Sequence, residues 1–356
     1  MTYLARPAIA LPEHVVTTDE LCEDIRRAHP DLPRLDAFLR IARATTVATR
    51  HFTRPLSAPT VSGDAPVEER NRAAYADALR LAVEAGRQAL THAGLEPEDV
   101  DCVVTSHTTS WTVPSLDIHL VHELGLRPDI RRIPLATLGC AGGAQSLVYA
   151  HRDIALHPGA HVLVVVAECL SAATYNHADT SRESMIYKAL FGDGAAAVVA
   201  SGAPARPGPR LLLDDTYEYV LPDSIERYRG RLSAAGLAFD SAPTATRALN
   251  DCLPALTKWL GGRPLDFAVV HPGGPRILTD AAHGLGLDPD PATGDLTHSW
   301  ASLAARGNLG GAAVLDVLAR TFDAPPPHDA EGLLIGFGPG FTLAAARGRF
   351  LDPARP

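Results

Sequence analysis

The sequence predicts an α/β fold that is built from two similar halves. Residues 138–143 read Leu-Gly-Cys-Ala-Gly-Gly, and residues 306–311 read Arg-Gly-Asn-Leu-Gly-Gly. Each of these G-x-x-G-G phrases is followed by a run of small residues typical of a helix, over 144–150 and over 312–318. Self-similarity on this scale indicates that one supersecondary unit is used twice.

Apolar strands flank both glycine-rich turns, which is the second observation behind this fold class. The upstream strands are predicted at 101–105 and 266–270, and the downstream strands at 161–166 and 332–336. Short apolar strands that alternate with longer amphipathic helices are typical of an α/β fold with mostly parallel strands.

The remaining elements follow from local composition. Helices are predicted at 16–28 and at 69–93, the second of them rich in Ala, Leu and Arg, and Ser, Pro, Thr and Gly predict a loop at 56–66. The densest cluster of Pro and Gly, over 201–209, is the best seam between the halves, so we predict an N-terminal half over 1–204 and a C-terminal half over 205–356. A second flexible stretch is expected at 324–329, before the last strand, and a frayed tail after Phe350.

Bulk composition narrows the function classes. The chain has 356 residues, 46% of them hydrophobic and 21% charged, as in an ordinary soluble enzyme. Its net charge of −9 argues against a nucleic-acid binder. No stretch approaches the roughly 20 apolar residues that span a bilayer, and the N-terminus lacks the pattern of a secretory signal. We therefore expect a cytoplasmic protein with no nucleic-acid or membrane partner.

The five cysteines are widely spaced and form no C-x-x-C pair. This pattern suits free thiols in a reducing compartment rather than disulfides or structural zinc. Most free cysteines are small buried hydrophobes, and we interpret four of them in that way: Cys22, Cys102, Cys169 and Cys252.

Cys140 is different because glycines surround it. Gly139, Gly142 and Gly143 allow a tight turn and a close backbone approach, which a core-packing cysteine does not need. The helix that follows would direct its N-terminal N–H groups at the sulfur. We therefore predict a nucleophile whose thiol pKa is lowered from about 8.5.

Two further residues complete the candidate site. His271 follows the strand at 266–270 and begins a Pro/Gly loop, at the edge where open α/β sheets place functional groups. Asn308 occupies the second turn at the position that Cys140 occupies in the first. Pseudo-two-fold symmetry would bring both turns to one central crevice.

These residues belong to motifs that resemble those of the type III polyketide synthases, the chalcone-synthase-like condensing enzymes of the thiolase superfamily. The motifs occur in the same order along nearly the whole chain: the G-C-x-G-G around Cys140, Leu190-Phe-Gly-Asp-Gly194, His271-Pro-Gly-Gly-Pro-Arg-Ile-Leu278, Gly307-Asn308 and Gly336-Phe-Gly-Pro-Gly340. The resemblance implies a thiolase-like fold, with two pseudo-symmetric α/β halves forming a five-layered αβαβα core. It also implies a homodimer, in which the loop near Val113 reaches the partner's cavity.

The resemblance implies roles for particular residues. Cys140, His271 and Asn308 would form the catalytic triad, and Phe191 would be the gatekeeping aromatic residue. Phe239 would line the pocket, and the 336–340 loop, with Gly338 and Pro339, would shape the cavity. For the phosphates of coenzyme A, Arg40 matches a family position, whereas a family lysine falls near Ala44 and is missing; the other candidates are Arg43, Arg276 and Arg50.

The implied reaction loads an acyl-CoA starter on Cys140, as a thiolate paired with the His271 imidazolium, and extends it with malonyl-CoA by decarboxylative Claisen condensation. His271 and Asn308 would stabilise the enolate oxygen. Decarboxylation supplies the carbanion, so no metal or redox cofactor is expected. His119, His122 and Glu123, which fall on one predicted helix, are interpreted as a solvated helix face rather than metal ligands.

Product identity is weakly encoded. The segments 108–114 and 175–187 should line or cap the cavity, where the rings of Trp111 and Tyr187 would narrow it and Gly310 would open space. We therefore expect few extensions and an alkyl-pyrone product, as in the bacterial alkylpyrone synthases that the chain resembles. The alternative within the family is a resorcinol- or naphthalene-type aromatic product.

Three alternatives lie outside that family. A β-ketoacyl synthase III shares the triad, but usually carries Gln-Ala-Asn after the histidine and takes its extender from acyl carrier protein. A Cys–His–Asn hydrolase would lack the internal repeat. A non-catalytic subunit would have no need to retain all three triad residues.

Overall fold

The computed structural model describes residues 1–354. Its strands are β1 (Thr2–Leu4), β2 (Ala8–Ala10), β3 (His14–Thr17), β4 (Thr49–Phe52), β5 (Cys102–His107), β6 (Arg131–Ala136), β7 (His161–Glu168), β8 (Gly194–Ser201), β9 (Arg210–Val220), β10 (Tyr228–Ser233), β11 (Gly236–Ser241), β12 (Phe267–Val270), β13 (Ala330–Gly338) and β14 (Thr342–Leu351). Its α-helices are α1 (Thr18–Ala28), α2 (Leu35–Ala44), α3 (Pro59–Ser62), α4 (Val67–Ala93), α5 (Leu116–Leu124), α6 (Gly142–Leu156), α7 (Leu170–Thr174), α8 (Arg182–Leu190), α9 (Ala248–Leu260), α10 (Pro275–Leu285), α11 (Thr297–Arg306) and α12 (Ala313–Asp323).

The predicted repeat is confirmed by the topology. In the N-terminal half, β5 and β7 pair in parallel, and α6 lies between them in the sequence. In the C-terminal half, β12 and β13 pair in parallel, and α12 lies between them in the sequence. A parallel pair needs a crossover connection, and a helix supplies it in both halves.

The two half-sheets join edge to edge in the order β12-β13-β14-β9-β1-β8-β7-β5-β6, with β2 paired to β8. The prediction of mostly parallel strands is wrong, because only β5–β6, β5–β7 and β12–β13 are parallel pairs. The remaining pairs of this sheet are antiparallel. The tight connection from β13 to β14 allows only an antiparallel neighbour, and β14 itself, which runs to Leu351, is absent from the sequence-based expectation.

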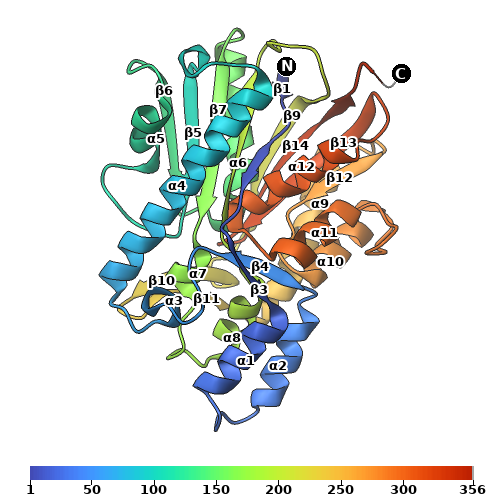
Figure 1. Ribbon diagram of the computed structural model, residues 1–356. Coiled ribbons are helices and arrows are strands. Elements are labelled where there is room, and N and C mark those ends of the chain that lie inside the picture. Colours follow the sequence, from blue (N-terminus) through green and yellow to red (C-terminus); the bar gives the residue numbers. More distant parts are fainter. Residues whose placement is uncertain (355–356) are drawn as a thin grey trace.

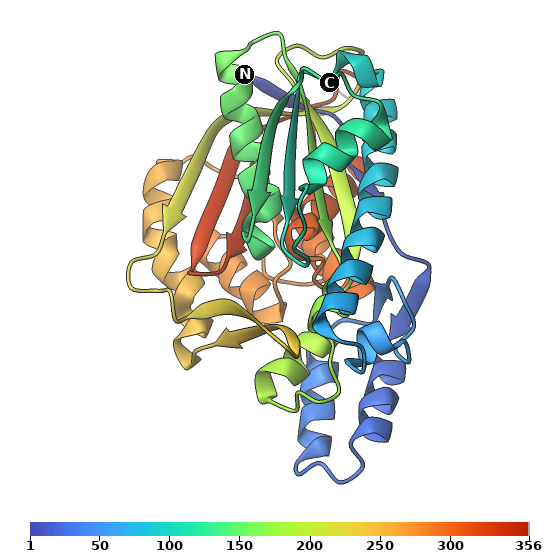
Figure 2. The ribbon, with the colours of Figure 1, turned by 90° about the vertical axis from the view of Figure 1, so that its left-hand side faces the viewer.

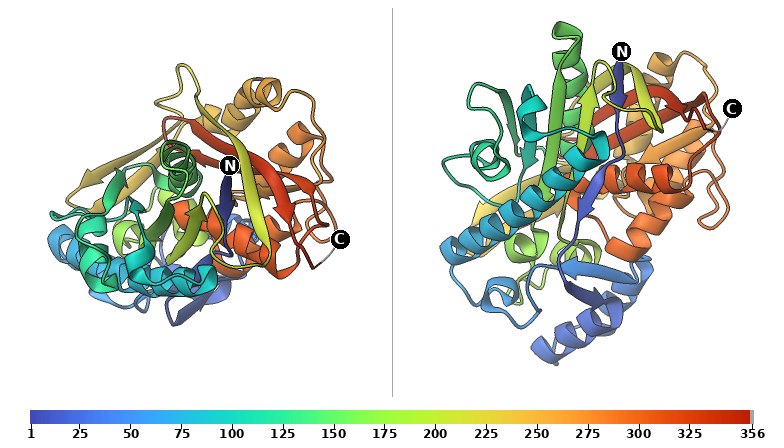
Figure 3. Two further views of the ribbon diagram at one scale, coloured as in Figure 1. Left: turned by 90° about the horizontal axis from the view of Figure 1, so that it is seen from above. Right: turned by 45° about the horizontal axis from the view of Figure 1, so that its top comes forward.

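Helices α6 and α12 lie between the two half-sheets, and their apolar side chains form one central core with the inward faces of both (Figures 1 and 3). Successive residues of a strand point to opposite faces, so Val164 enters this core, whereas Val165 enters a second core beneath α4 and α5. A third core lies beneath α9, α10 and α11. Together with the two half-sheets, these helices form the five layers that the family resemblance implies.

Helices α1 and α2 form a projection at the lower end of the molecule, with α8 packed against them (Figures 1 and 2). The predicted helices at 16–28 and 69–93 correspond to α1 and α4. The predicted loop at 56–66 contains the short helix α3. The seam at 201–209 falls between β8 and β9, and the division of the chain at residue 204 stays a prediction. Within the described residues, none of the helices has the length and apolarity that a membrane crossing needs.

Candidate active site

One cavity, of about 290 Å³, brings the three predicted catalytic residues together. Cys140, His271 and Asn308 all line it, and they come from three separate loops. The surrounding wall is largely aromatic and aliphatic. A concave, mostly apolar pocket with a few convergent polar groups is the usual form of an active site for an organic substrate.

The turn that carries Cys140 depends on its glycines. Gly139 has a φ of 54°, which other residues rarely adopt, and the short 3₁₀ turn Gly139–Ala141 leads directly into α6. A Cβ at Gly143 would lie 2.2 Å from the carbonyl oxygen of Gly311 in the second turn. The two G-x-x-G-G turns are therefore in direct backbone contact, as their predicted convergence on one crevice requires.

Asn308 is fixed by hydrogen bonds on three sides. Its backbone N–H donates to the Leu190 carbonyl, and its own carbonyl accepts from the Gly192 N–H, which forms a bridge beside Phe191. Its side-chain Oδ1 accepts the N–H of Gly310 at 2.9 Å. The amide Nδ2 is thereby turned toward Cys140 and lies 3.6 Å from the sulfur.

His271 sits directly after β12, at the carboxyl end of the edge strand of the C-terminal half-sheet. Its backbone N–H donates to the Ile335 carbonyl of β13, and its carbonyl accepts the N–H of Gly273. The side chain is 1% exposed, and neither ring nitrogen has a hydrogen-bond partner among residues 1–354. In the neutral ring, one nitrogen is therefore free to donate its N–H to a substrate oxygen and the other to accept a proton.

The electrostatics of the site differ from expectation. Burial raises the pKa of the Cys140 thiol to about 12 and lowers the pKa of His271 to about 3. Cys140 does lie at the N-terminus of α6, but removal from water disfavours the thiolate more strongly than the helix favours it. The predicted lowering of the thiol pKa is not met, because burial favours the neutral form of both groups.

A buried carboxyl group beside the site was missed in the sequence. Glu168 ends β7 with 1% exposure, and burial raises its pKa to about 8. One oxygen accepts the Thr108 N–H at 3.2 Å, and the other, Oε1, has no partner among the described residues. A Cβ at Gly310 would lie 3.0 Å from Glu168 Cγ. The sequence does carry a signal for this group, because a carboxylate at the end of an apolar, valine-rich strand is expected to be buried.

Stacked aromatic rings form one wall of the cavity. Phe191 and Tyr187 both line it, and their rings stack at 5.1 Å. Phe239 does not line the cavity but lies behind them, with its ring 5.7 Å from that of Phe191. Tyr228, which sequence reasoning missed, lines the wall and stacks on Phe239 at 5.6 Å.

Three further predicted pocket residues, besides Phe239, do not line the cavity. Trp111 is 62% exposed, and Asn71 binds its backbone, so this ring does not narrow the cavity of its own chain. Gly310 packs against Glu168 and opens no space for substrate. Pro339 lies over Gly139 behind the nucleophile, whereas its neighbour Gly338 does line the cavity.

The candidate coenzyme A residues separate into two groups. Arg276 lines the cavity, as does Thr45 directly after α2, and the exposed Arg40 and Arg43 belong to that helix. Arg276 also pairs with Asp280, and Arg43 with Asp19, on the surface. Arg50 is completely buried and donates to the Thr18 hydroxyl and the Ala189 carbonyl. It cannot reach a substrate phosphate, and its candidacy is wrong.

No cluster of three or more His, Cys, Asp or Glu side chains among residues 1–354 has the arrangement of a metal site. His119, His122 and Glu123 lie on α5 and form no such group.

Known proteins are similar to this chain in both amino-acid sequence and fold. Residues 3–204 match the N-terminal domain of the chalcone and stilbene synthases, and residues 213–347 match their C-terminal domain. A 1,3,6,8-tetrahydroxynaphthalene synthase of Streptomyces griseus is 34% identical over 98% of this chain and 92% of its own length. A phloroglucinol synthase of Pseudomonas fluorescens is 30% identical, with 98% of this chain and 99% of that protein covered.

Solved structures agree with these sequence relatives. The 1,3,6,8-tetrahydroxynaphthalene synthase of Streptomyces coelicolor, a bacterial type III polyketide synthase, superposes with a TM-score of 0.91 at 34% identity, covering 98% of this chain and 99% of that one. Germicidin synthase of the same organism, also a type III polyketide synthase, superposes with a TM-score of 0.89 at 32% identity and the same coverage. The chain thus belongs to the chalcone and stilbene synthase family, and it is a type III polyketide synthase.

Proposed function

We propose that this enzyme loads an acyl-CoA starter on Cys140 and extends it by decarboxylative condensation with malonyl-CoA. The observation that carries the proposal is the shared cavity, in which the Asn308 amide lies 3.6 Å from the Cys140 sulfur and an unpartnered His271 ring faces the same space. Thiol, imidazole and carboxamide are the groups that acyl transfer and enolate stabilisation need.

The loading step begins from neutral groups. As the Cys140 sulfur attacks the carbonyl carbon of the acyl-CoA, the His271 imidazole accepts the thiol proton. A new thioester forms on Cys140, the bond between the acyl carbon and the coenzyme A sulfur breaks, and His271 returns the proton to the departing thiolate. The proton transfer replaces the resting ion pair that the sequence suggested.

The extension step uses the same cavity with a different division of labour. Loss of CO₂ from malonyl-CoA leaves an enolate, whose oxygen is stabilised by the N–H of His271 and the Nδ2–H of Asn308. The hydrogen bond from Gly310 N–H to Asn308 Oδ1 holds the amide with its donor inward, so little reorganisation is needed. The enolate carbon then attacks the carbonyl carbon of the Cys140 thioester, and the bond from that carbon to the Cys140 sulfur breaks. The chain, longer by two carbons, is then carried by coenzyme A, and the released Cys140 thiolate takes up a proton or accepts the chain again for another round. This chemistry needs no metal or redox cofactor.

Phe191 supports the decarboxylation of the malonyl group. Its buried ring lies on the cavity wall, tied to Asn308 through the backbone bridge. An apolar wall beside a carboxylate favours the neutral product CO₂, because the charged form loses hydration there. Arg276, together with Arg40 and Arg43 on the exposed surface of α2, would attract the phosphates of coenzyme A to the entrance.

For the product, we propose a polyhydroxylated aromatic compound. Two relatives of similar identity are named for such products, tetrahydroxynaphthalene and phloroglucinol. Few extensions were expected because the Trp111 ring would narrow the cavity. Trp111 is 62% exposed and does not line the cavity of about 290 Å³, so this reason to expect early termination is removed. An alkyl-pyrone is the competing outcome.

We further propose that the enzyme is a homodimer. Strand β6 is the last strand of the sheet, and its outer edge has no partner among the described residues. Near it, the loop with Trp111 and Val113, 62% and 97% exposed, presents apolar side chains to solvent. An open sheet edge beside exposed apolar residues favours association. A monomer in sedimentation at micromolar concentration would contradict this part of the proposal.

The decisive experiment is mass spectrometry of products formed from a panel of acyl-CoA starters, with malonyl-CoA or malonyl-carrier protein as extender. Aromatic products from malonyl-CoA alone would support the full proposal, and lactones would select the pyrone. Exclusive use of the carrier protein would favour the β-ketoacyl synthase alternative, and release of free starter acids without extension would favour a hydrolase.

A further inference from the structure

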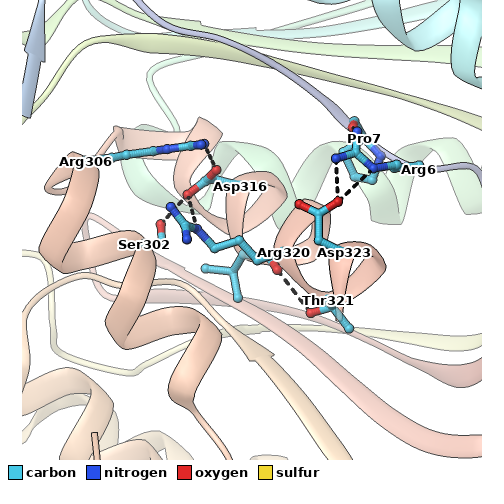
Figure 4. A network of polar contacts seen from close by, with 9 residues as sticks. Arg6, Pro7, Ser302, Arg306, Asp316, Arg320, Thr321 and Asp323 are labelled. Carbon is cyan, nitrogen blue, oxygen red and sulfur yellow. Dashed lines mark hydrogen bonds and ion pairs between the residues drawn. The ribbon is translucent and has the colours of Figure 1, made fainter. Parts of the chain in front are cut away.

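A second, polar cavity lies between α4, α11, α12 and the N-terminal segment. Its volume is about 210 Å³, and it shares no lining residue with the active site. Figure 4 shows the groups that dominate it. They are three guanidinium groups and two carboxylates, from Arg6, Arg306, Arg320, Asp316 and Asp323.

The charged groups of this cavity have a net charge of +1, because three guanidinium groups face two carboxylates. Asp316, with 0% exposure, serves two arginines, because one oxygen pairs with Arg306 and the other accepts from Arg320 at 3.2 Å. Arg6 pairs separately with Asp323 at 2.6 Å.

The network also leaves hydrogen-bond donors unused. The Ser302 hydroxyl donates to the same Asp316 oxygen as Arg320, at 2.6 Å, so that carboxylate is fully occupied. Arg306 and Arg320 each donate one hydrogen bond, both to Asp316, and their other N–H groups have no partner among residues 1–354. Both side chains are 24% exposed and line the cavity.

The two arginines also repel each other. Burial lowers the pKa of Arg306 to about 10, and the charge of Arg320 contributes to the same shift. An anion placed between them would relieve both effects, because it supplies acceptors and offsets the like charges. The neighbouring His92 does not add charge, since burial lowers its pKa as well.

We propose that this cavity binds a small dianion of the phosphate class. Planar guanidinium groups match the oxygen spacing of a tetrahedral oxyanion, and hydrogen bonds to such an ion are charge-assisted. The space corresponds to several water molecules at roughly 30 Å³ each, enough for inorganic phosphate with some water. Arg306 is the last residue of α11 and stands two positions before Asn308, so the ion would bind at the helix end that leads into the Asn308 turn.

Isothermal titration of the full-length protein with inorganic phosphate tests the proposal. The titration is done at constant ionic strength in chloride, with saturating coenzyme A, so that phosphate bound at the mouth of the catalytic cavity is not counted. We expect one saturable site per chain. In Arg320→Gln the affinity should fall about tenfold or more, because a charge-assisted donor is lost.

Arg349→Gln is the matched control, because Arg349 is likewise an ion-paired arginine, bound to Asp214 and Asp329, but lies outside the cavity. It should bind phosphate as the parent protein does. Arg6→Gln provides a second cavity variant at an exposed position and should also weaken binding, which keeps the test open if Arg320→Gln does not fold.

Three results would overturn the proposal. They are absence of saturable phosphate binding by the parent protein, unchanged affinity in the folded cavity variants, and equal affinity for malonate, which would show that the site does not select a tetrahedral ion.

Discussion

The two glycine-rich turns share one backbone plan but abut different groups of the opposite half. Gly139, in the Cys140 turn, packs against Pro339 beyond the end of β13, whereas Gly310, in the Asn308 turn, packs against Glu168 at the end of β7. In the internal repeat, β7 and β13 are equivalent strands. One turn therefore has an apolar neighbour and the other an ionisable one.

This difference shows how a duplicated unit acquires two roles. The Cys140 turn supplies the proposed nucleophile, and burial raises the pKa of its thiol, so a base must take the proton before the sulfur attacks. The Asn308 turn supplies a permanently neutral donor, whose orientation is set by Gly310 and does not depend on titration. Substitutions in either turn can separate these roles.

The largest effect is expected for Cys140→Ala. Without the sulfur no acyl-enzyme forms, and we expect product formation to fall by about 10³-fold or more. Mass spectrometry of the intact protein after incubation with an acyl-CoA should show no adduct. Cys252→Ala removes a buried thiol of the C-terminal half and is the control, because it should still acylate at Cys140. Retained product formation in folded Cys140→Ala would remove the nucleophile role.

Asn308→Ala should separate condensation from loading. Loss of one preorganised donor to a developing oxyanion costs about 3 kcal/mol, or a factor of 10² to 10³ in rate. Acylation of Cys140 should persist, because that step does not require the enolate site. Malonyl-CoA decarboxylation and acyl-enzyme formation, measured in parallel, check the division. Equal losses in both steps would indicate that Asn308 acts on the nucleophile instead.

Gly143→Ala tests whether the turns must touch. The added methyl group would lie 2.2 Å from the Gly311 carbonyl oxygen, which is rigid backbone, so we expect unfolding to become easier by about 3 kcal/mol. Chemical denaturation measures this loss. Gly159→Ala is the matched control, since nothing lies within 4 Å of its added Cβ, and it should change stability by less than about 0.5 kcal/mol. Equal stability of the two variants would contradict the close contact.

These contacts explain why the sequence predicted the convergence of Cys140 and Asn308 well and the surroundings of these residues less well. The repeated glycine phrase encodes the backbone contact directly, so Cys140 and Asn308 could be placed together before any coordinates. Burial is not encoded in the same local way. Arg50 looked like a surface cation, although strand β4 alternates and turns Arg50 and Phe52 inward together, a period-two signal that was available.

Other errors arose from long-range geometry. The prediction of a lowered thiol pKa rests on the helix N-terminus after Cys140, which is a local feature of the sequence. The desolvation that outweighs the effect of the helix comes from cavity walls contributed by distant segments, such as the hairpin with Tyr228. The family resemblance places Trp111 at the cavity, but in this structure its ring is 62% exposed. Strand order likewise depends on partners far away in the sequence.

The smallest effect concerns the ionisable neighbour of the Asn308 turn. Because burial raises the pKa of Glu168 to about 8 from a usual value of 4.5, the folded protein holds a proton that the unfolded chain releases above pH 4.5. Folding stability should therefore decline as the pH rises from 4.5 toward 8, and the decline should level off above 8.

The variant Glu168→Gln removes this titration, so the change in its unfolding free energy between pH 5 and pH 8 should be smaller than that of the parent protein by at least about 1 kcal/mol. Urea denaturation across this range measures the difference in slope, and Asp193, whose pKa burial raises to about 6, supplies a pH dependence that remains in both proteins. Identical slopes for the two proteins would mean that Glu168 is ionised in the fold and that the Asn308 turn rests against a charge.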